Sequence, residues 1–166
     1  MSMMRWLLAV VMFWPSLAAA SGWANVDPGM TTTVEVRERF GAPSRETHAK
    51  VEGYDTTQWI YEGSRAPAGL LRITVDFGIL TPAGYKPTTV RLLKLEPKPF
   101  IFGRLTVVQG WGIPDSVGTT EGVTTFFYRD GLFVVFDKEE TSATSMIFSV
   151  PQPDPASTPS TPPAQR

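Results

Sequence analysis

Four sequence landmarks occur twice in the same order, and this apparent duplication constrains the fold more than any other feature of the chain. The first set is Arg39-Phe-Gly-Ala-Pro43, Trp59-Ile-Tyr61, Ile73-Thr-Val-Asp-Phe77 and Leu92-Leu-Lys-Leu-Glu-Pro-Lys-Pro99. The second set is Gly110-Trp-Gly-Ile-Pro114, Phe126-Phe-Tyr128, Leu132-Phe-Val-Val-Phe136 and Met146-Ile-Phe-Ser-Val-Pro-Gln-Pro153. Because the order is shared, we predict two tandem copies, over residues 21–99 and 100–150.

Each copy is predicted to begin with a short helical segment and to continue with strands. Thr32 and Glu35 have the spacing of a capping box at a helix start, and Gly41 provides a helix end. From Leu71 to Phe77 apolar and polar residues alternate, as expected for a strand with one buried face. We therefore expect an α+β fold in which each copy has a helical segment and an antiparallel sheet of three or four strands.

The strands of the second copy are apolar on both faces, unlike the alternating strand of the first copy. If Phe136 matches Phe77, then the outer face of these strands is apolar as well, because Phe127, Phe133 and Val135 stand where the first copy has Ile60, Thr74 and Asp76. An apolar second face needs a cover, which is either the first copy or another protein.

Aromatic residues often contribute most of the binding energy at protein interfaces. We therefore interpret Phe127, Phe133 and Val135 as partner-binding residues, with the predicted loop 115–125 beside them. Trp23 is a further candidate contact residue, whereas Trp59 and Trp111 occupy matching landmarks and are predicted to lie in the core.

Both ends of the chain have compositions unlike the middle. Arg5 precedes about nine apolar residues, too few for a membrane span of roughly twenty, and small residues follow up to Ala20. This pattern predicts a cleaved signal peptide over 1–20 and export to the periplasm. At the other end, residues 151–166 contain six prolines and no large apolar residue, which predicts a disordered tail.

Charge and cysteine content exclude several classes of function. Removing Arg5 with the signal peptide leaves 14 basic and 16 acidic residues. The resulting net charge of −2 is not the excess of basic residues that is typical of nucleic-acid-binding proteins. The chain has no cysteine, so a lipid anchor on an N-terminal cysteine, disulfides and thiol chemistry are not expected. We expect no metal and no cofactor.

The chemical motifs of enzymes are also missing from the sequence. His48 is the only histidine, and it falls in a polar stretch over 44–53 that we interpret as a loop, with no nucleophile motif nearby. Several carboxylates could converge in a fold, but their spacing selects no pair for acid–base work. The sequence therefore favours a non-enzymatic protein, and an uncharacterised envelope enzyme is the third alternative.

The residues of the first copy resemble a known family. Gly29-Met-Thr31, the helix with Val36, the turn Phe40-Gly-Ala-Pro43, Trp59-Ile-Tyr61 and the strand ending at Phe77 are similar to the BamE/SmpA family of envelope proteins. The same helix-then-sheet unit is similar to the repeat of the β-lactamase inhibitory protein. The resemblance implies non-enzymatic work through protein contacts, either in outer-membrane protein assembly or in inhibition of a hydrolase. We thus expect a soluble periplasmic module that binds another envelope protein.

Overall fold

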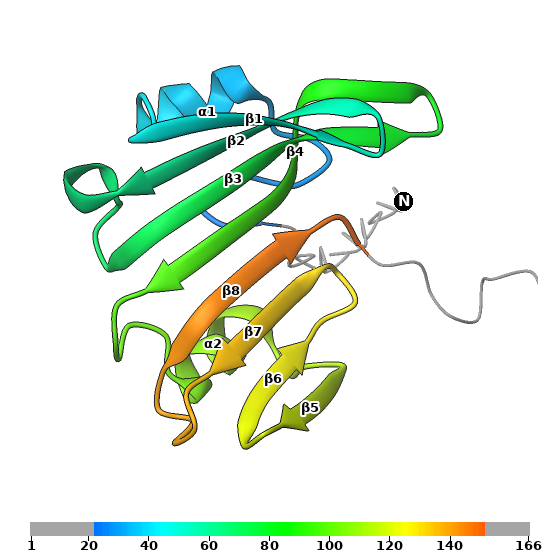
Figure 1. Cartoon of the computed structure of the whole chain (residues 1–166). Coiled ribbons are helices and arrows are strands. Elements are labelled where there is room, and N and C mark those ends of the chain that lie inside the picture. Colours follow the sequence, from blue (N-terminus) through cyan, green and yellow to red (C-terminus); the bar gives the residue numbers. More distant parts are fainter. Residues whose placement is uncertain (1–21, 152–166) are drawn as a thin grey trace, which may run out of the picture.

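The computed structural model describes residues 22–151, and the predicted signal peptide and nearly all of the predicted tail lie outside them. The described residues form two helices of eight residues each and eight strands (Figure 1). The first run is α1 (Thr33–Phe40), β1 (Arg45–Val51), β2 (Tyr54–Glu62), β3 (Leu70–Thr81) and β4 (Gly84–Pro97), with a short 3-10 turn at Gly63–Arg65. The second run is α2 (Arg104–Trp111), β5 (Ser116–Thr120), β6 (Val123–Phe127), β7 (Leu132–Phe136) and β8 (Ala143–Ser149).

All eight strands form one antiparallel sheet in the order β1-β2-β3-β4-β8-β7-β6-β5. The two runs meet where β4 pairs with β8, with Leu92 opposite Ser149 and Leu95 opposite Met146. The expected α+β fold of two helix-plus-sheet units is therefore wrong, because the protein is mostly β with one large sheet. Sequence periodicity could not reveal this pairing, since it predicts individual strands and not their neighbours.

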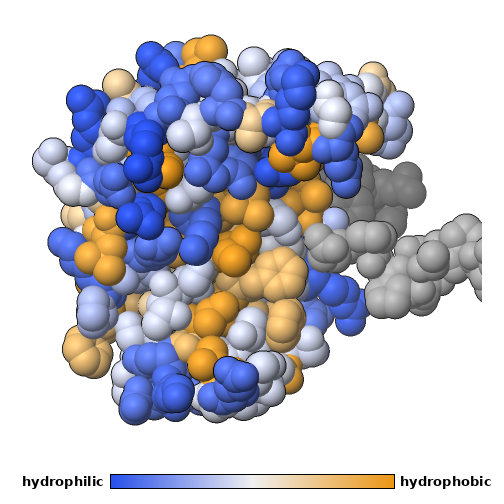
Figure 2. Space-filling model, in the orientation of Figure 1, coloured by the Kyte–Doolittle hydropathy of each residue, from blue (hydrophilic) through white to orange (hydrophobic). Residues whose placement is uncertain are grey.

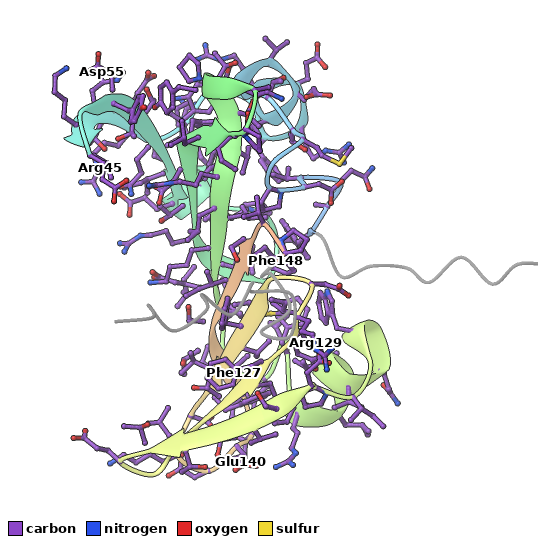
Figure 3. All side chains as sticks on the ribbon, turned by 90° about the vertical axis from the view of Figure 1, so that its right-hand side faces the viewer. Arg45, Asp55, Phe127, Arg129, Glu140 and Phe148 are labelled. Atoms are coloured by element: carbon purple, nitrogen blue, oxygen red, sulfur yellow. The ribbon has the colours of Figure 1, made fainter. Side chains whose placement is uncertain are left out.

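The core lies between the sheet and the two helices, which cover the same face of the sheet (Figure 3). Val36 of α1 and Val107 of α2 are fully buried there. Every second residue of the central strands points toward them, as the alternation in Leu71–Phe77 predicted. The predicted core position of Trp59 is also confirmed, since it is buried, whereas Trp111 is half-buried and packs on Phe148 at the border of the core.

Equivalent contacts hold each helix to its strands. The hydroxyl of Tyr61 donates to the carbonyl of Gly41 at the end of α1, over 3.1 Å, and Tyr128 donates to Gly112 at the end of α2 over the same distance. Both glycines have a positive φ, +76° and +82°, which a residue with a Cβ adopts only with strain. The helix ends and the tyrosines therefore fix where each helix sits on the sheet.

Local sequence signals explain one helix better than the other. At the start of α1 the Glu35 carboxylate accepts the backbone N–H of Thr32 at 2.7 Å, as the capping box predicted. At the start of α2 the N-cap is Gly103, and no acidic residue lies in the first turn. Packing of Val107 and Trp111 on the core holds this helix instead.

Candidate functional site

The face of the sheet opposite the helices is open, and its two halves differ in chemistry. Figure 2 shows hydrophilic side chains over the region of β1–β4 and an apolar region over β6–β8, seen from the orientation of Figure 1. Directly opposed residues of neighbouring antiparallel strands share a face, so the strand register identifies which side chains form each half. The apolar half is the candidate functional site, and we call it the apolar face.

The apolar face is built on the pair Phe127 and Phe133, which stand opposite each other on β6 and β7. Their rings contact edge to face, with centroids 5.6 Å apart and planes at 89°. Phe133 is also opposite Ile147 of β8, and Val135 is opposite Thr125 of β6. Figure 3 shows Phe127 on the side of the sheet away from both helices, whereas Phe148 points toward them.

These side chains are half-buried, because they cover one another along the sheet while one side of each remains in water. Neither helix reaches them, since α1 packs over Trp59 and Tyr61, and α2 packs over Phe126 and Phe148, all on the other face. The first half of the chain does not cover them either, because its strands continue the same sheet sideways. Among residues 22–151, no element therefore covers the apolar face.

The open face of β2–β4 carries charges where the apolar face carries rings. Arg72 forms ion pairs with Glu62 at 3.0 Å and with Glu96 at 3.6 Å, and Lys94 reaches Glu96 at 3.1 Å. Asp76 accepts a hydrogen bond from Gln58 at 2.8 Å. These charges are solvated and mutually paired, so this half of the face satisfies its own polar groups without a partner protein.

The four residues that the sequence suggested for binding do not all come together. Phe127, Phe133 and Val135 share the apolar face, and Ile147 is a member that the sequence analysis missed. Its alternation between the buried Met146 and Phe148 was the signal that could have identified it. Trp23 lies elsewhere, stacked on Phe40 at 6.1 Å and half-buried against the core on the helix side.

The segments expected as loops contain strands. The stretch around His48 forms β1, an edge strand whose seven residues are all exposed, and the region beside the apolar face forms β5 and the start of β6. Both differ from expectation because edge strands bury little, so their sequences need no apolar alternation. His48 contacts Thr57 at 3.1 Å and Glu46 at 3.5 Å on this exposed edge.

A groove lies on the helix side of the sheet, between α1 and the strands β1 and β2. This groove of about 540 Å³ is lined by residues that include Val34, Arg37, Glu46 and Trp59. The Arg37 guanidinium lies 4.9 Å from the centre of the Trp59 ring, a cation–π contact between two residues that line the groove. Acidic and basic groups both line it, so its charge selects no ligand class.

The titratable groups with shifted pKa values near α2 form hydrogen bonds that stabilise the fold. Hydrogen bonds from Thr124 and Arg104 hold the pKa of the Glu140 carboxyl below its ordinary value. Burial, followed by the nearby Asp115 carboxylate, raises the pKa of Tyr128, whose hydroxyl supports the end of α2. Within residues 22–151 no group of three or more His, Cys, Asp or Glu side chains is placed to hold a metal ion.

Comparisons with known proteins identify no family for this chain. No family model matches the chain, and no curated protein sequence matches it. A solved structure of a DUF4309 family protein, YjgB from Bacillus subtilis, is similar with a TM-score of 0.47 and 13% sequence identity. That match covers 76% of this chain and 83% of the other. No helix within the described part of the chain is long and apolar enough to span a bilayer.

Proposed function

We propose that this protein is an exported binding module of the cell envelope, and that the apolar face is where it holds a partner protein. The observation that carries the proposal is the Phe127–Phe133 pair, which lies on an open sheet face with no helix over it. Large aromatic residues in such positions are the usual anchors of protein interfaces. An exposed apolar cluster promotes aggregation unless another protein covers it, so its presence supports a binding role.

The contrast within the same sheet supports the proposal. A sheet needs only one apolar face to fold, as the solvated, ion-paired half over β2–β4 demonstrates. The rings of Phe127 and Phe133 are therefore in excess of what the fold requires. Binding through such a face needs no cofactor, and it suits the work expected from the sequence, an accessory of envelope or outer-membrane protein assembly.

The proposed cellular location is argued from the N-terminal sequence. There a positive charge, an apolar stretch and small residues follow one another in the order typical of a secretory signal peptide. We place the mature protein in the periplasm on this ground. An epitope-tagged full-length chain should appear in the periplasmic fraction, shortened by about twenty residues at its N-terminus. Recovery of the uncut chain in the cytoplasm would contradict the location.

The binding proposal is tested by affinity purification of the tagged chain from periplasm and solubilised outer membrane. We expect Phe133→Asp to abolish recovery of the partner, because a buried unpaired carboxylate at an interface is costly. Thr74→Asp is the matched control, since Thr74 is opposite Ile60 just as Phe133 is opposite Phe127. Circular dichroism first confirms that both variants fold. Equal recovery by a folded Phe133→Asp variant would remove the apolar face as the binding site.

The identity of the captured partner separates the two expected roles. Outer-membrane assembly components would support the accessory role. A hydrolase that the purified chain inhibits at one-to-one stoichiometry would support the inhibitor role, with the same face blocking the enzyme.

A further inference from the structure

The two edges of the sheet are protected very differently. An edge strand presents unpaired backbone N–H and C=O groups, and natural proteins usually guard such an edge with charged side chains or proline. At one edge, β1 carries four titratable side chains among its seven residues: Arg45, Glu46, His48 and Lys50. At the other edge, β5 has the sequence Ser-Val-Gly-Thr-Thr, with no charge and no proline. The unguarded edge is the one beside the apolar face.

The side chains of β5 leave the apolar face accessible up to this edge. Ser116, Gly118 and Thr120 are opposite Phe127, Thr125 and Val123 of β6, so these small residues lie on the open face. Gly118 has no side chain to cover its neighbour, and a Cβ placed there would come within 3.0 Å of the Phe127 ring. The ring therefore extends over β5 toward the free edge, where the next strand would contact it.

We propose that β5 accepts an extended segment of the partner protein as a ninth strand, which continues the apolar face beyond β5. This inference rests on the proposed function and specifies the form of the partner. Backbone hydrogen bonds to β5 would supply affinity, and alternate apolar side chains of the segment would pack beside Phe127. The free backbone of a strand matches only another extended backbone, which excludes a preformed helix as the element that binds this edge.

The charges at the ends of β5 select the occupant further. Asp115 precedes the strand and is paired with Arg129 at 3.2 Å, whereas Glu121 follows the strand. Parallel pairing of two copies of β5 would set Glu121 against Glu121, which is unfavourable between paired strands. A segment with Lys or Arg opposite Glu121 complements this carboxylate and is therefore a better occupant than a second copy.

The test uses a capped peptide, Lys-Thr-Val-Thr-Val-Thr-Val-Thr-Lys, added to the full mature chain and followed by amide hydrogen exchange and calorimetry. We expect exchange to slow by about tenfold or more at saturation for those amides between Ser116 and Thr120 whose N–H groups point away from β6, because these groups become hydrogen-bonded. Exchange at the guarded edge strand β1 should not change. A peptide that leaves the β5 amides unprotected, or that does not bind at millimolar concentration, overturns the inference.

Two N-methylated peptides separate backbone pairing from simple contact with the apolar face. N–H groups of alternate residues point to opposite edges of a strand, so methylating the three valines blocks one edge and methylating the threonines blocks the other. We expect one of the two peptides to bind about tenfold or more weakly and the other to bind normally, because several backbone hydrogen bonds are lost together. Equal binding by both peptides contradicts strand addition.

Matched protein variants provide the final control. Val117→Lys places a charge on the β5 edge, where Val117 is 54% exposed, and should weaken binding of the peptide severalfold. Val51→Lys makes the same change on β1, where Val51 is 39% exposed, and should leave binding unchanged. If the peptide does not bind to β5 while capture of the partner still depends on Phe133, only the proposed strand addition is wrong. If capture is also independent of Phe133, the proposed function fails as well.

Discussion

The two halves of the sheet share a core and differ on the face that the core does not use. On the helix side, Trp59 meets Phe77 edge to face at 4.8 Å, and Phe126 meets Phe136 in the same way at 4.8 Å. On the open side, the same strand positions hold Thr74 in one half and Phe133 in the other. The comparison teaches that the buried face determines the fold in both halves, and that the open face is free to differ for function.

The largest expected effect comes from truncating one phenylalanine on each face of β7. Phe136→Ala should lower the free energy of unfolding by about 3–5 kcal/mol, because it leaves a cavity in the core. Phe133→Ala, on the apolar face, should cost only about 1 kcal/mol, since the lost contact is one half-exposed aromatic pair. Urea denaturation of both variants measures the difference. Equal losses would mean that the apolar face is part of the core.

A smaller effect is expected at the hydrogen bonds that hold the two helices. Tyr61→Phe and Tyr128→Phe each remove one bond to a glycine carbonyl, so each should lower the free energy of unfolding by about 1 kcal/mol at neutral pH. If one substitution leaves the free energy of unfolding unchanged and the other lowers it by several kcal/mol, the two tyrosines are not equivalent and the two halves are not held in the same way.

The same tyrosines give the protein an alkaline limit. Burial raises the pKa of Tyr61 from 10.0 to about 12, so the folded state holds this proton more tightly than the unfolded chain. The unfolded chain therefore releases the proton first, and stability should fall as pH rises from about 10 to about 12. Tyr61→Phe should make this fall shallower. A denaturation series over that pH range measures the slope, and an unchanged slope in the variant would contradict the assignment.

The smallest effect is expected at Glu140, which links the turn before β8 to α2 and β6. Its carboxylate accepts hydrogen bonds from Thr124 at 2.6 Å and from Arg104. Because its pKa is lowered in the folded state, its contribution to stability is present above the ordinary value of 4.5 and is lost as pH falls below it. Glu140→Gln should therefore lower the stability slightly at pH 7, and should flatten the loss of stability between about pH 5 and pH 3. An identical acid profile for both proteins would exclude this role.

The sequence predicted the interior strands from two signals: apolar and polar residues alternate in Leu71–Phe77, and Leu132–Phe136 is a short apolar run that matches it. It also predicted that Phe127, Phe133 and Val135 share a face, because side chains in paired strands repeat every two residues. The single sheet could not be predicted, since the β4–β8 pairing depends on contacts between residues more than fifty positions apart. The edge strands β1 and β5 were missed because neither needs buried residues to form, and with β5 the candidate strand-accepting edge was missed as well.

The most direct measurement is photo-crosslinking in intact cells, with a photoreactive phenylalanine analogue placed at one position of the full-length chain at a time. Placed at position 133, the analogue should crosslink a discrete partner protein, because the apolar face is buried against it. At position 74, the matched position over the charged half, no crosslinked product is expected. Crosslinking at 74 and not at 133, or at neither position while a partner is still recovered by affinity purification, would contradict the account.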